Sequence, residues 1–215
     1  RALTAAASRA HLAVNVGPRY QVGRIRTAGS VPLAERGSKN FRARTRRAIR
    51  QLEETGRLTL RQEHPGNAED TRRLLHEGLR LEHAGWKGSE HSSILSTEGS
   101  VRFIEDQAVQ LAKWHQLELN FLEHDGRVIA FEYGWLAKQT YHSFKIAYDE
   151  AYRRFSPGQL LTYFLLVRLN GTTRAIDFLG PLDGAARRWH PEQYTVGRLV
   201  FSAGGVVRRL LVRAL

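Results

Sequence analysis

The chain has 215 residues, of which 42% are hydrophobic, so it is long and apolar enough to bury the core of at least one domain. It contains no cysteine, which excludes disulfides, thiolate metal sites and a cysteine nucleophile. The net charge is +12 and 28 of the 33 basic residues are arginine. Nucleic acids, acidic lipids and phosphorylated small molecules are therefore candidate partners, although an arginine-rich composition gives the same charge without any function.

The ends of the chain and its apolar runs bear on where it acts. No apolar run is long enough to span a membrane and no signal peptide is visible, so we expect no transmembrane segment and a cytoplasmic protein. The chain begins at Arg1 and contains no methionine. We therefore expect a processed chain or a fragment.

The first strong helix signal covers residues 38–56, SKNFRARTRRAIRQLEETG. Phe41 and Leu52 fall on its inward face, Ser38 or Asn40 can cap its start, and Gly56 ends it. The arginines at 42, 46 and 50 recur every four residues, so we expect them to form an exposed basic stripe.

The other elements follow from periodicity and turn residues. Helices are expected over 1–14, 68–83 (capped by Asn67), 98–115, 159–169, 183–189 and about 206–211, with a loop at 83–88. Strands are expected over 57–61, 117–123, 128–137, 140–149, 174–180 and 194–202, with hairpin turns at 124–127 and 138–139.

From residue 117 onward this order is a three-strand meander, then helix, strand, helix and strand. A meander that continues into a strand–helix–strand crossover predicts an α+β fold. Its mixed, mostly antiparallel sheet would be flanked by helices. Ligands in such sheets prefer the crossover, which here begins after residue 149.

The start of that crossover, KIAYDEAYRRFSPGQLL (145–161), has the features of an anion site. Pro157 suits the first turn of a helix, and the free N–H groups and dipole of that helix attract anions. Gly158 allows close approach of a ligand to the backbone, while Arg153 and Arg154 can grip phosphate. An ordinary capped helix start explains the same residues, but the arginines favour a bound pyrophosphate.

The same residues resemble a known motif. Arg153-x-x-Ser156-x-Gly158-x-x-Leu161 resembles the R/Q-x-x-G-x-G-x-x-L loop of the GNAT acyltransferases, with Ser156 in place of the first glycine. The segments EHAGWKG, FKIAYDEAYRRFSPGQLL and IDFLG, in that order, are similar to the cellulose-biosynthesis acetyltransferase branch, which is allied to the Fem-type aminoacyltransferases. SEHSS (89–93) departs from the glycine-threonine pair usual in that branch.

The resemblance covers about residues 38–200 and implies a GNAT-like domain over 38–215, with 1–37 as the remnant of an N-terminal half. It also implies acetyl-CoA or another acyl-CoA as co-substrate, in a slot where strands 140–149 and 174–179 splay apart. An amide around Ile146, Ala147 or Tyr148 would stabilise the developing oxyanion. The residues that it assigns to coenzyme A in the loop are Arg153, Arg154, Ser156, Pro157, Gly158 and Gln159.

Acidic residues near the slot are the candidates for the general base. Asp149 is preferred, Glu150 follows it, and Asp177 is an acid in a buried strand. Each has a structural alternative: ion pairs with Arg153 or Arg154 for the first two, and a bond to a helix terminus for Asp177. Strand alternation places Lys145, Ala147 and Asp149 on one face, and Phe144, Ile146 and Tyr148 on the other.

Trp86 and Lys87 lie in the loop that the resemblance places beside the acceptor, where they would form a stacking wall and a ligand for an anionic group. A hydrophobic plug with a solvated lysine is the alternative. His76 and His83 share a helix face, but no third ligand has suitable spacing, so we expect no metal.

Three functions stay open at this point. The first is transfer of an acyl group from acyl-CoA to an amine or hydroxyl of a small molecule or cell-envelope precursor. The second is a Fem-like transferase that uses aminoacyl-tRNA, which the basic surface suits. The third is a nucleic-acid-binding module that uses the arginines at 42, 46, 47 and 50, although no base-reading residues accompany them.

Overall fold

The computed structural model describes residues 6–7, 9–10, 12–27, 32 and 35–202. Contacts divide the chain into two units, one of residues 1–22 and 193–215 and one of residues 23–192. The strands are β1 (Ala13–Arg26), β2 (Leu58–Glu63), β3 (Leu117–His124), β4 (Arg127–Ala137), β5 (Thr140–Tyr148), β6 (Ala175–Asp177) and β7 (Glu192–Ser202). The helices are α2 (Lys39–Glu53), α3 (Ala68–Ala84), α4 (Trp86–Ser89), η2 (Ile94–Ser96), α5 (Glu98–Lys113), η3 (Glu150–Phe155), α6 (Pro157–Leu169) and α7 (Gly184–Arg187).

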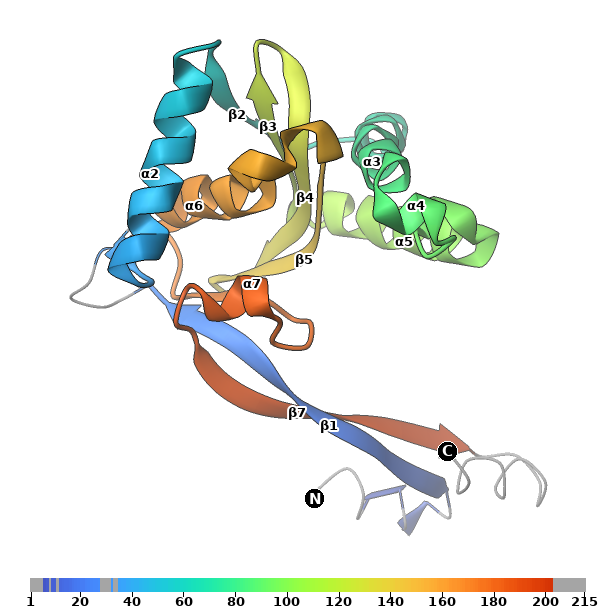
Figure 1. The fold of residues 1–215 in the computed structure, drawn as a ribbon. Coiled ribbons are helices and arrows are strands. Elements are labelled where there is room, and N and C mark those ends of the chain that lie inside the picture. The colour runs from blue at the N-terminus through green and yellow to red at the C-terminus, as the bar shows by residue number, and fades with distance from the viewer. Residues whose placement is uncertain (1–5, 8, 11, 28–31, 33–34, 203–215) are drawn as a thin grey trace. The chain divides into compact units, whose positions relative to one another are not determined.

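The strands form a mixed sheet in the order β2-β3-β4-β5-β6-β1-β7. The pairs β2–β3, β3–β4, β4–β5 and β1–β6 are antiparallel, and β5 and β6 are parallel neighbours joined by the crossover through α6. The predicted α+β fold, the meander and the crossover are therefore confirmed (Figure 1).

Two tight turns set the register of the meander. Asp125 and Gly126 join β3 to β4 with φ of 49° and 78°, and Lys138 and Gln139 join β4 to β5 with φ of 49° and 60°. Positive φ at both central residues matches the right-handed twist of hairpin strands. Both predicted hairpins are present.

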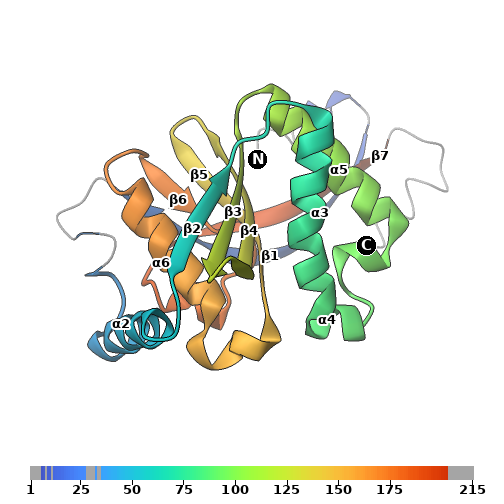
Figure 2. The same cartoon turned by 90° about the horizontal axis from the view of Figure 1, so that it is seen from above.

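Helices cover both faces of the sheet in the unit of residues 23–192 (Figure 2). Helices α2 and α6 pack on one face around a core that includes Leu161, Leu165 and Ile129. Helices α3 and α5 pack on the other face around Leu75, Leu79 and Phe131. We call the face covered by α2 and α6 the α6 face, and the face covered by α3 and α5 the α3 face.

The first basic helix is oriented as expected, with one difference. Phe41 and Leu52 are 5% and 1% exposed, and Arg46 and Arg50 lie outward. Ser38 caps the helix, accepting from the amide of Phe41. Arg42 is partly buried because its guanidinium donates to the carbonyls of residues 35 and 37 at 2.9 and 2.6 Å.

Several predicted elements differ from the observed ones. Residues 13–26 form strand β1, so the helix expected over 1–14 is wrong at its end, and the strand was missed. The strand expected over 174–180 is only three residues long, α7 is shorter than expected, and residues 86–89 form the short helix α4. The final helix near 206–211 lies outside the described residues, and a remnant domain over 1–37 stays a prediction.

No helix within the described ranges combines the length and the apolar character needed to cross a membrane.

Candidate active site

The site begins where β5 and β6 separate. The two strands pair only at Thr140–Ala175, Tyr141–Ile176 and His142–Asp177. β6 ends at Asp177, whereas β5 continues to Tyr148. The splayed pair expected from the sequence is therefore present, and from residue 143 onward one edge of β5 has no neighbouring strand among the described residues.

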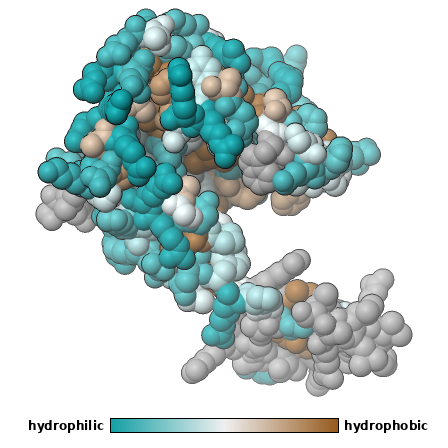
Figure 3. All heavy atoms as spheres, viewed as in Figure 1, coloured by the Kyte–Doolittle hydropathy of each residue, from teal (hydrophilic) through white to brown (hydrophobic). Residues whose placement is uncertain are grey.

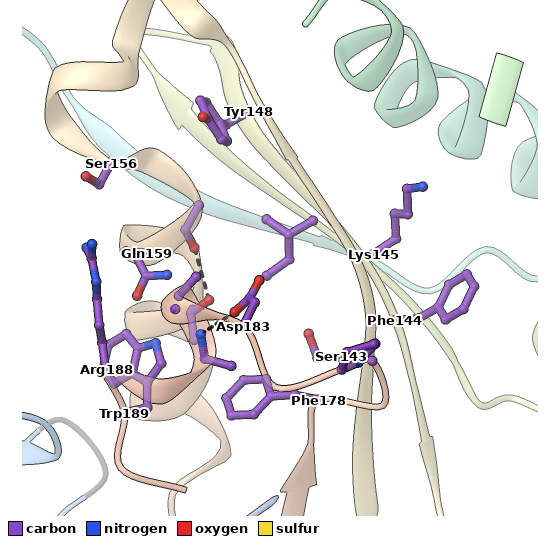
Figure 4. Close-up of a pocket in the computed structure, with 18 of the residues that line it drawn as sticks. Ser143, Phe144, Lys145, Tyr148, Ser156, Gln159, Phe178, Asp183, Arg188 and Trp189 are labelled. Carbon is purple, nitrogen blue, oxygen red and sulfur yellow. Dashed lines mark hydrogen bonds between the residues drawn. The ribbon is translucent and has the colours of Figure 1, made fainter. Parts of the chain in front are cut away.

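A cavity of about 780 Å³ opens at this edge (Figure 4). Its walls come from the second half of β5, from the start of α6 with the preceding turn, and from residues 178–189, which follow β6. Of the cofactor residues predicted from the sequence, the lining includes Ile146, Tyr148, Arg153, Ser156, Gly158 and Gln159. Ala147, Arg154 and Pro157 do not line it.

A bulge changes which side chains of β5 face the cavity. The register with β4 shifts so that Lys145 pairs with Tyr133 while Ser143 pairs with Gly134. Phe144 is the extra residue and contacts the rings of Tyr133 and Trp135 on the α3 face. The expectation that it shares a face with Ile146 and Tyr148 is therefore wrong, because a bulge interrupts strand alternation.

The open edge of β5 carries main-chain donors. The amide of Asp149 donates to the carbonyl of Ile129 on β4 at 2.9 Å. Because strand amides alternate between the two edges, those of Tyr148 and Ile146 are directed away from β4. These two amides are the donors that an oxyanion beside β5 would meet.

The turn before α6 has the geometry of an anion site. Ser156 adopts the left-handed region at φ 53° and ψ 57°. That conformation favours glycine, which explains why the GNAT motif has glycine at this position. Pro157 has no amide hydrogen, and the amides of Gln159 and Leu160 donate to the Ser156 carbonyl at 2.8 and 3.2 Å.

The Gly158 amide and the Ser156 hydroxyl are thus left as donors at the positive end of a 13-residue helix. A Cβ on Gly158 would lie 3.2 Å from Cγ2 of Ile146. Glycine therefore also allows the first turn of α6 to approach β5 closely.

Two arginines line the cavity, in addition to Lys145. Arg153 lines it, as predicted, whereas the Arg154 guanidinium lies 4.5 Å from the ring of Phe155. Arg188, which follows α7, is the second, and Figure 4 shows its side chain extending toward the turn at Ser156. Sequence reasoning missed Arg188 because no motif surrounds it.

The three predicted acids lie outside the cavity lining. Asp149 pairs with Arg127 at 2.6 Å and accepts from the amide of Ala151. Glu150 lies 4.0 Å from Arg153, as one structural alternative proposed. Asp177 is 1% exposed, binds Arg24 at 2.8 Å and accepts from the Leu179 amide at 3.0 Å.

A different acid lies deeper in the sheet. Glu132 on β4 is fully buried and pairs across the strands with Ile146. Its Oε2 accepts from the Tyr141 hydroxyl at 2.5 Å and from Asn120 at 2.9 Å. Its Oε1 has no partner within the described part of the chain.

Burial raises the pKa of Glu132 to about 7, although the hydroxyls of Tyr141 and Ser143 and the Asn120 amide favour the ionised form. Ser143 lines the cavity, whereas Glu132 does not, so the Ser143 hydroxyl connects this carboxyl to the cavity. Glu132 was missed from the sequence, where a single glutamate among the apolar residues of a predicted strand was the available signal.

Lys145 lies on the α3 face, where its ammonium pairs with Glu82 at 2.6 Å. Glu82 also accepts from the Ile94 amide at 3.2 Å. This buried pair connects β5 to the C-terminal part of α3. The backbone continues from there into α4, which contains Trp86 and Lys87. The side chains of Trp86 and Lys87 lie outside the described ones, so their predicted contact with the acceptor stays a prediction.

Comparison with known proteins identifies the class. The model of the family described as acetyltransferase (GNAT) domain matches residues 39–194, and the chain belongs to that family. No curated protein matches.

Solved structures share the fold. A conserved protein of unknown function from Bacteroides thetaiotaomicron has a TM-score of 0.53 and 14% identity, over 86% of this chain and 62% of that one. The C-terminal domain of a protein named lysylphosphatidylglycerol synthetase, from Agrobacterium fabrum, has a TM-score of 0.56 and 13% identity, over 98% of this chain and 67% of that one. L-PGS from Bacillus licheniformis has a TM-score of 0.53 and 11% identity, over 99% and 68%. The chain thus spans 62–68% of the length of these three solved chains.

Proposed function

We propose that the protein transfers an acyl group, such as acetyl, from an acyl-CoA to an amine or hydroxyl. The observation that carries this proposal is the end of β6 after three paired residues. It exposes an edge of β5 within a cavity that also contains the N-terminal turn of α6. A thioester and a diphosphate can thus be held in one cavity, as the family membership favours.

The residues present fit the donor. Arg153, Arg188 and Ser156 line the same cavity as Gly158, and together they provide charge and hydrogen bonds for a diphosphate. The arm of the donor would then follow the open edge of β5. There the amide of Ile146 or Tyr148 donates to the thioester oxygen and stabilises the charge that develops on it.

Proton transfer is assigned to three side chains. As the acceptor nitrogen or oxygen bonds to the acyl carbon and the carbon–sulfur bond breaks, the acceptor proton passes to the Ser143 hydroxyl, which lines the cavity, while the hydroxyl proton of Ser143 passes to the buried Glu132, whose pKa of about 7 suits a base at neutral pH. Burial raises the pKa of Tyr148, so its hydroxyl stays protonated and can donate to the departing sulfur. Asp149, Glu150 and Asp177 are not needed in this scheme.

The acceptor is proposed to approach from the α3 face, near Lys145 and α4. Because β6 is absent beyond residue 177, the cavity reaches both faces of β5. A small molecule or cell-envelope precursor with an anionic group remains our proposal for the acceptor, with Trp86 and Lys87 beside it.

A second candidate is supported by the surface of α2. Arg44, Arg46, Arg47 and Arg50 are outward, and no acidic side chain of the described ranges lies within ion-pair distance of them. Figure 3 shows hydrophilic side chains over much of that side of the protein. An aminoacyl-tRNA would use this surface for its backbone, and one structure with this fold carries the name lysylphosphatidylglycerol synthetase.

Calorimetric titration with acetyl-CoA tests the first candidate. Arg153→Ala removes a cation from the cavity wall, so we expect affinity to fall on the order of tenfold, since a charge-assisted hydrogen bond contributes roughly 1.5 kcal/mol or more. Arg154→Ala is the matched control, because that side chain lies over Phe155 outside the lining. Its affinity should stay within about twofold of wild type. Wild-type protein that binds no acetyl-CoA, or two variants that bind equally well, would place the donor elsewhere.

A further inference from the structure

Two buried polar atoms in the cavity wall lack partners. The indole Nε1 of Trp189 and the amide Oε1 of Gln159 have no hydrogen-bond partner among the described residues. Both residues line the cavity, and Trp189 is only 1% exposed. Figure 4 shows Gln159, from the first turn of α6, and Trp189, from the segment after α7, on the same side of the cavity.

The fold accounts for the Trp189 ring but not for its N–H group. The ring packs edge-on against Phe41 of α2, with centroids 4.8 Å apart, and a phenylalanine would supply the same kind of contact. A buried donor or acceptor that stays unpaired costs roughly 1–3 kcal/mol, and native proteins retain few of them. An unpaired donor and an unpaired acceptor in one cavity wall therefore indicate a ligand that serves both.

The ligand group that complements this pair is a secondary amide. An amide presents one carbonyl oxygen and one N–H group, which match the indole donor and the side-chain carbonyl of Gln159. Arg153, Ser156 and Arg188 line the same cavity. The ligand thus combines an anionic group with an amide-bearing arm.

We propose that Trp189 and Gln159 bind an amide of a phosphopantetheine arm, with the indole N–H donating to its oxygen and Gln159 Oε1 accepting from its N–H. This rests on the proposed acyl-CoA function and adds two specificity-determining residues to it. A phosphopantetheine arm carries amides between its phosphate and its sulfur, whereas the 3′ end of a tRNA carries none before the aminoacyl ester. The pair therefore distinguishes the two donor classes. The arm can come from coenzyme A or from a carrier protein, which share this chemistry.

Three probes separate the arm from the anion: acetyl-CoA, adenosine 3′,5′-bisphosphate, which lacks the arm, and pantetheine, which lacks the nucleotide. Trp189→Phe keeps the ring contact with Phe41 and removes the N–H group. We expect its affinity for acetyl-CoA and pantetheine to fall about three- to tenfold, with its affinity for the bisphosphate within twofold of wild type. Arg153→Ala should instead weaken binding of the bisphosphate, and of acetyl-CoA with it, and leave pantetheine binding close to wild type. Trp114→Phe, at a side chain that is largely exposed on the C-terminal side of α5, is the matched control.

Gln159→Met tests the proposed amide contact independently if the tryptophan variant folds poorly. It should reproduce the loss for acetyl-CoA and pantetheine, and the double variant should lose less than the sum, because both residues bind one amide. Equal binding of acetyl-CoA by wild type and both single variants would overturn this inference and leave the proposed function standing. Wild-type protein that binds pantetheine but neither nucleotide would favour an arm presented by a carrier protein. Failure to bind any of the three probes would overturn both proposals.

Discussion

At the scale of single residues, Glu132 has an environment far from that of an ordinary glutamate, because burial raises its pKa to about 7. Its carboxyl is fully buried on the α6 face of the sheet, with Tyr141 and Asn120 on Oε2. The charge of Glu118, which pairs with Arg168 of α6 at 2.5 Å, also acts on it. The negative charge of Glu118 further disfavours ionisation of Glu132 and so helps to raise its pKa.

This environment predicts a stability that depends on pH. The pKa of Glu132 is about 7 in the folded protein and about 4.5 in the unfolded chain, so the folded state binds the proton more tightly. The contribution to stability is complete below pH 4.5 and is lost as pH rises through 7. Relative to Glu132→Gln, wild-type stability should fall by on the order of 3 kcal/mol across this window. Urea denaturation of both proteins from pH 4.5 to 8 measures it, and parallel curves would show that the carboxyl does not titrate there.

The same substitution tests the proposed base. If Glu132 takes the acceptor proton, kcat/KM should rise with pH toward a plateau above about 7, and Glu132→Gln should lose both that limb and most of the activity. Asp149→Asn is the matched control, because its carboxyl is bound by Arg127. An unchanged pH profile in the Glu132 variant would contradict the assignment.

The sequence predicts site residues best where the main chain makes the site. In the proposed site, Ser156, Pro157 and Gly158 contribute backbone geometry and a helix end, which local sequence encodes. Glu132 and Trp189 act through what packs on them from distant segments, so neither position was predictable from its neighbours. Asp149 differs from them: its place next to the turn suggests a catalytic role, and the structure shows its carboxylate bound by Arg127, which lies a hairpin away.

At the scale of elements, the sequence predicts those that carry local periodicity or turn signals. Helices α2, α3 and α6 and the meander have such signals, and their positions are close to the expected ones. Strand β1 has Gly17, Pro18 and Gly23 within it, and its pairing partners β6 and β7 are about 150 residues away or more. Its own residues carry no periodicity or turn signal that identifies them as a strand. The bulge at Phe144 likewise depends on β4 and not on the sequence of β5.

The contact of α3 with β4 gives a prediction at this scale. A Cβ on Gly78 would lie 2.3 Å from the ring of Phe131, which is fully buried. Gly78→Ala gains up to about 1 kcal/mol in helix propensity, but forcing helix and sheet apart costs more. We expect net destabilisation of about 1–2 kcal/mol in chemical denaturation.

Gly99→Ala provides the comparison for that variant. Gly99 lies in the first turn of α5, where an added Cβ meets nothing within 4 Å. Alanine there should be neutral or stabilise the protein by up to about 1 kcal/mol. If both alanine variants gained stability, α3 would have room to move away from Phe131, and close packing would not explain the glycine.

At the scale of the whole molecule, the +12 charge is distributed between two kinds of place. Some arginines are built into the fold, such as Arg61, which pairs with Glu63, Glu77 and Glu123 at 2.5–2.9 Å. Others, on α2, face outward without acidic partners in the described ranges. Composition alone does not separate these two groups, which is why net charge left three functions open.

Replacing the outward arginines of α2 tests whether the donor is an acyl-CoA or a polynucleotide. The quadruple variant Arg44→Gln, Arg46→Gln, Arg47→Gln and Arg50→Gln removes four exposed charges. At about 0.15 M salt, charges beyond about 8 Å are screened. We therefore expect acetyl-CoA affinity within twofold of wild type, together with weaker binding to tRNA. Each lost phosphate contact should also reduce the slope of log K against log salt by roughly 0.9.

A quadruple variant that loses acetyl-CoA binding as strongly as Arg153→Ala would mean that α2 belongs to the donor site. Wild-type protein that binds tRNA far more tightly than DNA of equal length, with that preference lost in the variant, would instead support the aminoacyl-tRNA candidate.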